Sequence, residues 1–276
     1  MRRSFYSIIV TVGTLLQILS SCSKSSQPTF KVAATSVPHA EILEFIQPDL
    51  KNEGIPFEIL IIDDFNTQNR ALVDGEVEAN YFQHLPFLEA QKKDFGYALE
   101  SLVAVHVEPM ALYSKKYLTL TQLPKGAIIA IPSDPSNQAR ALNLLEESGL
   151  ITLRPNGTKT GILDITANPD HLTFIELDSP LLSRSLDDVD AAVISTNFAL
   201  LAGLSPQKDA LAIESAHSHF ANIVVIRAGE GQRRELQVLK RALTSEKTRH
   251  FIEERYQGAI IPADDQAIGS NQPVKE

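Results

Sequence analysis

A short apolar run near the middle of the chain leads directly into the start of a helix, and this junction strongly constrains the fold. Residues 127–131 are typical of a buried strand, and residues 141–148 have helical spacing that ends at Gly149. The turn 132–140 between them reads Pro-Ser-Asp-Pro-Ser-Asn-Gln-Ala-Arg. Such a turn points backbone N–H groups and the positive end of the helix dipole past the carboxyl edge of a sheet, where open α/β folds bind ligands.

The residues of this turn favour a carboxylate as the ligand. Asp134 is a good N-terminal cap and Pro135 suits the first helical position, which places Asn137 and Arg140 three residues apart on one helical face. Arginine recognises a carboxylate with two parallel hydrogen bonds, and a neighbouring amide adds directional ones. The alternative is a well-capped helix that carries a surface arginine.

The rest of the chain alternates between strand and helix patterns, which predicts the α/β class with a parallel sheet covered by helices. An amphipathic helix opens at Pro38 and ends at Gly54. The other expected strands are 29–35, 56–62, 77–83, 172–177, 191–195 and 222–227, and the other helices are 69–73, 180–186 and 232–256.

One segment predicts a crossing between two lobes. The segment 98–114 is long and β-like but contains Pro109, which disfavours an uninterrupted central strand. The expected first lobe consists of residues 29–110 plus 228–262 and the second of residues 111–227, with the strand 222–227 returning to the first lobe. The polar tail 263–276 is expected to be disordered.

The N-terminus has the pattern of a secretory signal. Arg2 and Arg3 precede a mostly apolar stretch shorter than a membrane-spanning helix, and the sequence Leu-Ser-Ser-Cys closes it at Cys22. These four residues resemble a bacterial lipobox, so we expect residues 1–21 to be removed, Cys22 to carry lipid such as palmitate, and residues 22–28 to form a tether. A signal peptide followed by an incidental cysteine is the alternative. As the single cysteine, Cys22 can form no internal disulfide.

The net charge of the chain limits the kinds of molecule that it can bind. Removal of residues 1–21 takes two of the 25 basic residues and none of the 34 acidic ones, so the net charge changes from −9 to −11. An acidic chain without a basic cluster argues against nucleic acid. We expect membrane attachment through lipid rather than through a basic surface.

Several polar residues fall at the ends of expected strands. Alternation puts Phe82 and His84 on one face of the strand 77–83. Asn197 follows the strand 191–195, and Asn222 is a polar residue at the start of an otherwise apolar strand. The simpler interpretation is a satisfied core histidine and two helix-capping or strand-end asparagines.

Enzymatic signatures are missing from the sequence. It has no Gly-x-Ser-x-Gly elbow, no phosphate or dinucleotide glycine loop and no His-Glu-x-x-His motif, so we expect no catalytic residues and no cofactor. His217 and His219 could place two imidazoles on one face, but a metal site needs further ligands and none is near in sequence.

Taken together, five segments resemble those of the bacterial methionine-binding lipoproteins that serve methionine ABC importers. The resemblance covers roughly residues 30–262 and implies a periplasmic-binding-protein-like fold of two α/β lobes with the ligand held between them. The matching segments are Val-Pro-His-Ala-Glu-Ile-Leu at 37–43, Asn-Tyr-Phe-Gln-His-Leu-Pro-Phe-Leu at 80–88, the turn 132–140, Ser-Thr-Asn-Phe-Ala at 195–199 and Phe-Ala-Asn-Ile at 220–223.

The resemblance also implies a role for each site residue. Arg140 would bind the carboxylate with help from Asn137, and Asn197 and Asn222 would serve the amino and carboxylate ends. Phe65, Phe82, His84 and Phe87 would surround the side chain, since a polarizable thioether gains from aromatic edges. Phe65 and Phe87 stand where the family usually has tyrosine, and His219 adds an imidazole, which bears on ligand identity more than on fold.

The function that these features predict is capture of L-methionine and its delivery to an importer made of a permease and an ATPase. D-methionine, a methionine dipeptide or another apolar amino acid are alternative ligands. A surface lipoprotein with an adhesion role is the alternative from another class.

Overall fold

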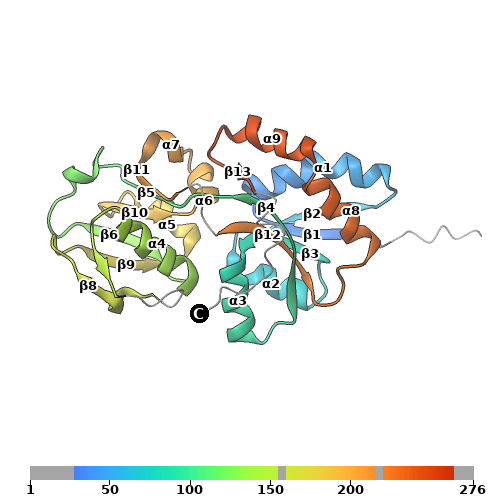
Figure 1. The fold of residues 1–276 in the computed structure, drawn as a ribbon, viewed down its shortest axis with the longest axis horizontal. Helices are drawn as coiled ribbons and strands as arrows, with labels where there is room; N and C mark the ends of the chain where they lie inside the picture. The colour runs from blue at the N-terminus through green and yellow to red at the C-terminus, as the bar shows by residue number, and fades with distance from the viewer. Residues whose placement is uncertain (1–27, 155–159, 216–219, 264–276) are drawn as a thin grey trace, which may run out of the picture.

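The computed structural model describes residues 28–154, 160–215 and 220–263, and Figure 1 shows them as two α/β halves side by side. The signal segment, Cys22, the pair His217 and His219, and the tail 264–276 lie outside the described residues. We call the six-stranded sheet with its helices the first half, and the five-stranded sheet with its helices the second half.

The first half contains both ends of the described chain. Its sheet has the order β13-β4-β12-β3-β1-β2, in which β1 is parallel to β2 and β3, whereas β12 is antiparallel to β3 and β4. The elements are β1 (Phe30–Ala34), a helical turn η1 (Ser36–Ala40), α1 (Glu41–Asn52), β2 (Phe57–Ile61), α2 (Phe65–Val73), β3 (Ala79–His84), α3 (Leu85–Phe95), β4 (Leu99–Val107), β12 (Ala221–Arg227), α8 (Arg234–Leu243), α9 (Glu246–Tyr256) and β13 (Ile261–Pro262).

The second half is the continuous middle of the chain. Its sheet has the order β11-β5-β10-β6-β9, in which β6 is parallel to β9 and β10 while β5 is antiparallel to β10. Its elements are β5 (Ala111–Tyr113), η2 (Leu120–Gln122), β6 (Ile128–Pro132), α4 (Pro135–Glu147), η4 (Ile162–Asp164), β9 (Thr173–Leu177), α5 (Ser179–Ser185), β10 (Ala191–Ile194), α6 (Thr196–Leu201), α7 (Pro206–Asp209) and β11 (Ala210–Ile213), with a small hairpin of β7 (Thr152–Leu153) and β8 (Ile165–Ala167).

Each sheet buries apolar side chains on both faces. In the first half, the buried stripe of α1 at Ile42, Leu43, Ile46 and Leu50 packs with α8 and α9 over one face, while residues of α2 and α3 cover the other. In the second half, α4 covers one face, and α5 and α6 cover the other. The helix-covered strands thus follow the predicted layering, although both sheets are mixed rather than purely parallel.

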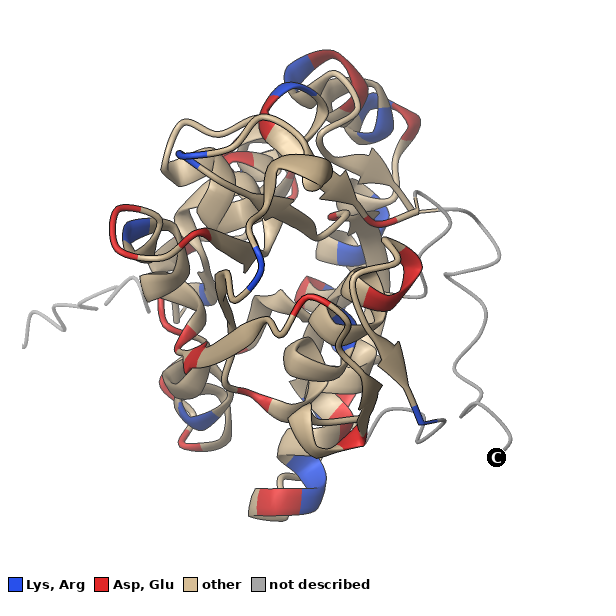
Figure 2. Cartoon of the chain, turned by 90° about the vertical axis from the view of Figure 1, so that its left-hand side faces the viewer, with Lys and Arg blue, Asp and Glu red and all other residues tan. Residues whose placement is uncertain are grey.

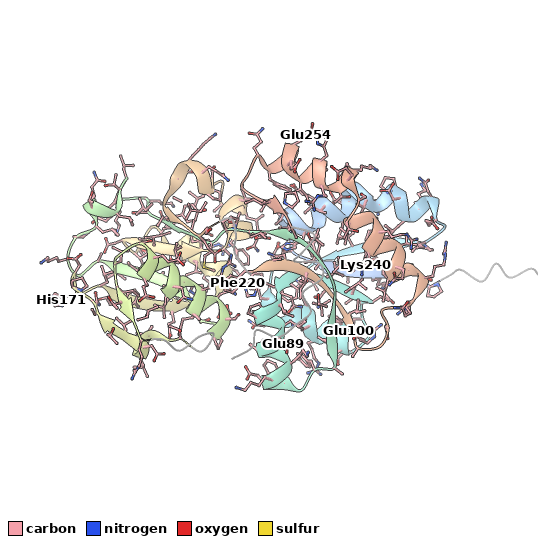
Figure 3. All side chains as sticks on the ribbon, in the orientation of Figure 1. Glu89, Glu100, His171, Phe220, Lys240 and Glu254 are labelled. Carbon is pink, nitrogen blue, oxygen red and sulfur yellow. The ribbon has the colours of Figure 1, made fainter. Side chains whose placement is uncertain are left out.

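Two segments cross between the halves. One joins β4 to β5 through Glu108 and Pro109, where the proline interrupts the long β-like stretch as predicted. The other runs from β11 to β12, and β12 takes its place in the first sheet between β4 and β3. Phe220, just before β12, lies at the junction of the halves (Figure 3).

The prediction of one long helix over residues 232–256 is wrong, because the structure has two helices there. The helix α8 ends at Leu243, and α9 begins only at Glu246. Ser245 adopts extended backbone dihedrals, and its side chain accepts a hydrogen bond from the Thr248 N–H, which makes it the N-terminal cap of a new helix. The predicted apolar stripe nevertheless holds, since Leu236, Leu239, Leu243 and Ile252 are all buried.

Candidate functional site

One cavity at the junction of the halves brings together all eight residues singled out from the sequence. The void between its walls, including the part open to solvent, measures about 320 Å³. Phe65 begins α2, Phe87 lies in the first turn of α3, and Phe82 and His84 lie at the carboxyl end of β3. The second half contributes Asn137 and Arg140 from the first turns of α4 and Asn197 from α6, while Asn222 stands at the start of β12; Gln83, Glu108 and Ser195 also line the cavity.

Aromatic rings form an apolar wall on one side of the cavity. The ring centroid of Phe65 lies 5.6 Å from that of Phe82, 5.9 Å from that of Phe87 and 5.1 Å from that of Phe198. Offset or edge-on rings at these separations attract one another and exclude water. Phe198 packs behind the wall in the core of the second half, and sequence reasoning did not single it out.

His84 connects the two halves. Its Nδ1 accepts the N–H of Phe87 at 3.2 Å, so Nε2 carries the proton and donates to Asn137 Oδ1 at 3.0 Å. Burial, with help from the nearby Arg140 charge, lowers the pKa of His84 to about 3, so the ring is neutral. His84 is therefore a fixed donor rather than a general base.

The cap of α4 has the predicted form and reaches further than predicted. The Asp134 side chain accepts the N–H of Asn137 at 2.9 Å and also accepts from the Asn137 side-chain amide at 3.0 and 3.1 Å. With its oxygen on His84 and its nitrogen on Asp134, Asn137 has both ends of its amide bonded within the protein. Its geometry suits an orienting role beside the cavity.

Arg140 is buried and held by a carboxylate that the sequence did not reveal. Its Nε donates to Glu214 Oε1 at 2.9 Å, and its Nη2 donates to Glu214 Oε2 and to the backbone oxygen of Glu108. The ring of Phe220 lies 4.4 Å from the guanidinium carbon. These contacts fix the plane of the fork, and among the described residues none takes Nη1, which leaves that edge of the fork open for another acceptor.

The two asparagines of the cavity differ in what they already bind. The side-chain nitrogen of Asn197 is buried with no hydrogen-bond partner among the described residues, although the residue lines the cavity. A buried amide left unpaired is costly, which points to an acceptor that the protein itself does not supply. Asn222 Oδ1 in contrast faces His39 Nε2 at 3.1 Å.

A buried cluster of His39, His106 and Glu108 stands behind this wall. Glu108 Oε1 lies 2.8 Å from His106 Nε2 and 3.3 Å from His39 Nε2, and its Oε2 accepts the N–H of Asn197 at 3.0 Å. The Nδ1 atoms of the two rings are bonded to the hydroxyls of Thr35 and Tyr81. His106 Nε2 thus donates to Glu108 Oε1, whereas the hydrogen bond of His39 Nε2 goes to Asn222 Oδ1.

Burial sets the charge of this cluster. Burial lowers the pKa of His39 to about 4 and that of His106 to about 3, so both rings are neutral near pH 7. Burial also raises the pKa of Glu108, an effect that His39 opposes. The three donor groups lie within 4.8 Å of one another, close enough for a metal, but every ring nitrogen already has a protein partner, and we interpret the group as a hydrogen-bonded cluster.

Two signals in the sequence could have revealed Glu108. It sits in His-Val-Glu-Pro at 106–109, where a carboxylate directly follows the end of a strand and precedes the proline of the crossing. His39 lies inside the matching segment 37–43 but gave no sign of its partner, because the two positions are far apart in the chain.

The comparisons with known proteins agree over most of the chain. A family model described as NlpA lipoprotein matches residues 30–264. The methionine-binding lipoprotein MetQ of Bacillus subtilis is 39% identical over 246 residues, which cover 87% of this chain and 90% of that protein. A nutrient-binding protein from Burkholderia cenocepacia solved with bound methionine has a TM-score of 0.83 at 38% identity, covering 86% of this chain and 100% of that chain. A periplasmic substrate-binding protein of an ABC transporter from Coxiella burnetii has a TM-score of 0.81 at 44% identity, with 85% and 100% covered.

These matches confirm the two-lobe α/β fold of the periplasmic-binding-protein type and the resemblance noted in the sequence. The family model extends from β1 to the end of the described chain, and the named relatives align over nine-tenths or more of their own length. The chain belongs to the NlpA lipoprotein family.

Proposed function

We propose that this protein captures L-methionine in the cavity between its halves and delivers it to an ABC importer. The observation that carries the proposal is the composition of one cavity, which joins an aromatic wall to the open edge of a buried arginine. A free amino acid with an apolar side chain has the same two parts. The Burkholderia cenocepacia relative, solved with methionine, supports this choice.

The charged end of the ligand accounts for the unpaired groups. The carboxylate of methionine would accept from Arg140 Nη1 and from the buried nitrogen of Asn197, which replace its lost water. Asn222 would serve the amino end, and His84 and Asn137 would hold this wall in place.

The apolar wall suits a thioether. Sulfur gains from contact with aromatic edges, and three phenylalanines surround this part of the cavity. Because Phe65 and Phe87 lack hydroxyls, this wall offers the side chain no hydrogen bond, which favours an apolar ligand over a polar one.

The lobes that would close on the ligand are proposed from the same topology. We place residues 29–110 and 228–262 in one lobe and residues 111–220 in the other, with β12 assigned to the first lobe because it pairs with β3 and β4. The hydrogen bond from His84 to Asn137 would then be one of the contacts that closure makes.

Membership in the family makes the protein a membrane-anchored lipoprotein of the bacterial cell envelope. Among the described residues, no helix has both the length and the apolar character to cross a membrane. We propose that lipid on Cys22 supplies the anchor, that the domain faces the periplasm and that a permease with its ATPase receives the ligand. The Coxiella burnetii relative, named as part of an ABC transporter, supports this partnership.

The test is to identify what the protein carries. Mass spectrometry of small molecules released from the denatured, unlipidated domain should find methionine in amounts close to one per chain. Calorimetry of ligand-free protein with L-methionine, D-methionine, a methionine dipeptide and leucine then ranks the candidates. Tighter binding of one of the other compounds would change the ligand, and failure of every amino acid and dipeptide to bind would favour an adhesion role.

A further inference from the structure

The proposed function leaves one buried charge at the cavity unexplained. Arg140 is neutralised by Glu214, so Glu108, only 4% exposed, remains as a carboxylate without a cation of its own. The groups that face it from every neighbouring element do not supply one: His39 on η1, Tyr81 and His84 on β3, His106 on β4, Arg140 with Glu214, and Tyr256 on α9.

Glu108 also lies where the second charge of an amino acid must be. In a zwitterion the ammonium and carboxylate groups share one carbon, so their receptors must be adjacent. The Nη2 of Arg140 donates to the backbone oxygen of Glu108 at 2.6 Å, which places the two residues side by side on the cavity wall. Asn197 links them to the ligand site from the other side, because its N–H holds Glu108 Oε2.

Building on the proposed function, we propose that Glu108, held between His39 and His106, receives the ammonium group of the ligand, and that binding expels the proton of Glu108 where this carboxyl is protonated. His106 Nε2 donates to Glu108 Oε1 and the Asn197 N–H donates to Oε2, so the carboxylate is oriented without being neutralised, and His39 Nε2 lies 3.3 Å from Oε1. The ammonium group supplies the missing positive charge. The buried charge of Glu108 is therefore paired with a cation only when the ligand occupies the cavity.

The sign of the proton coupling follows from burial. Burial raises the pKa of Glu108, so as the pH falls this carboxyl takes up a proton before an exposed glutamate would. The protonated group cannot pair with an ammonium ion, so affinity falls as the pH falls. The three histidines do not titrate between pH 5 and 7, because burial lowers the pKa of His39 to about 4 and those of His84 and His106 to about 3. The charged groups of a free amino acid also keep their charges between about pH 5 and 7.

The first test separates the two ends of the ligand. It compares L-methionine with 4-(methylsulfanyl)butanoic acid, which lacks only the amino group, on the wild-type protein and on Glu108→Gln. We expect Glu108→Gln to weaken methionine binding about 100-fold or more and to change binding of the desamino acid by less than about threefold, since only methionine loses an ion pair. Glu89→Gln, which removes an exposed charge paired with Lys92, is the matched control and should change neither.

Equal losses for the two compounds in a folded Glu108→Gln variant would overturn the proposal and leave the proposed function standing. A wild-type protein that binds neither compound would instead contradict the proposed function as well. The desamino acid thus distinguishes an ammonium receptor from a residue that merely shapes the cavity.

The second test needs no variant. Calorimetry of methionine binding between pH 5 and 7, in pairs of buffers with different heats of ionisation, measures the protons released. Wherever Glu108 is protonated in the ligand-free protein, we expect binding to release a proton and the affinity to fall by up to about tenfold per pH unit as the pH falls. Heats that do not depend on the buffer, together with an affinity that is flat from pH 5 to 7, would overturn the coupling.

Discussion

At the scale of single residues, Arg140 has two tasks that its geometry keeps apart. One edge of the guanidinium binds Glu214 and the backbone of Glu108, while Nη1 has no partner among the described residues and Arg140 lines the cavity. The buried ion pair with Glu214 orients the fork before any ligand arrives, which lowers the ordering cost of binding. Removing either partner leaves the other charge buried and unpaired, so the pair is sensitive from both sides.

We expect Arg140→Ala to reduce methionine affinity by about 3–5 kcal/mol, because the ligand carboxylate would lose its cation. Glu214→Gln keeps the cation but frees the fork, so its loss should be smaller, about 1–3 kcal/mol. Calorimetry measures both, with circular dichroism as the check on folding. Near-native affinity in folded Arg140→Ala protein would exclude the carboxylate role, and a larger loss in Glu214→Gln would reverse the assignment of receptor and support.

Single residues also differ in whether the sequence could predict their place in the site. Arg140 and Asn137 stand in a local pattern of cap, proline and helical spacing, which can be recognised within nine residues. Glu214 contacts Arg140 across 74 positions of the chain, and His39 contacts Glu108 across 69. No local sequence pattern predicts contacts between residues so far apart. The eight residues found by motif all line the cavity, whereas Glu108 was missed because a single carboxylate between a strand and a proline belongs to no known motif.

At the scale of elements, helix caps link stability to the site. Asp134 caps α4 and holds the Asn137 amide, while Ser245 caps α9 in the first half, on an element that lines no part of the cavity. Both caps satisfy backbone N–H groups that a helix start leaves free. Only the first is connected to the cavity wall.

Asp134→Ala and Ser245→Ala should therefore form a matched pair. Each is expected to lower the free energy of unfolding by about 1 kcal/mol, the usual cost of a lost cap. Only Asp134→Ala should also weaken methionine binding, because it releases Asn137 and with it His84. Urea unfolding and calorimetry measure the two quantities, and an equal loss of affinity in Ser245→Ala would mean that stability alone governs binding.

Elements were predicted best where periodicity is strong and worst where a cap interrupts it. The apolar stripe of residues 236–252 continues across the junction of α8 and α9, so spacing alone could not show the break that Ser245 makes. The mixed strand directions had a different cause. The chain returns from the second half and places β12 between β3 and β4. The sequence of a strand does not show which distant strand it pairs with.

At the scale of the whole molecule, charge is arranged differently inside and outside. In the view of Figure 2, basic residues lie scattered among acidic ones over the described surface. The interior at the junction instead gathers three neutral histidines, His39, His84 and His106, around the Glu108 carboxylate and the ion pair of Arg140 with Glu214. Glu108 in the first crossing segment, and Glu214 and Phe220 at the described ends of the second, contact Arg140 here, so the protonation of this interior bears on contacts between the halves.

Acid should destabilise the ligand-free protein through these histidines. In the folded protein the pKa is about 4 for His39 and about 3 for His84 and His106, whereas in the unfolded chain each is about 6.5. The unfolded chain therefore binds more protons. Their stabilising contribution is complete above about pH 6.5 and is lost as the pH falls towards 4. The raised pKa of Glu108 has the opposite sign and offsets part of the loss.

Urea unfolding at pH 7, 6 and 5 measures this slope. Replacing His106 with Gln should flatten it, whereas His250→Gln should leave it unchanged, because His250 is exposed on α9. A slope that both variants share with the wild type would assign the acid sensitivity to other groups.

The pairing of Arg140 with Glu214 also changes how relatives should be compared across evolution. An arginine that holds part of the architecture will be retained by a descendant that has lost its cargo, because drift at position 140 is blocked until position 214 changes with it. The two positions are thus expected to covary, and the presence of the arginine is a poor fingerprint of a working transporter component. Asn197, whose side-chain nitrogen has no partner in the described protein, is free of that constraint, so its loss in a lineage is the earlier mark of a site released from selection for binding.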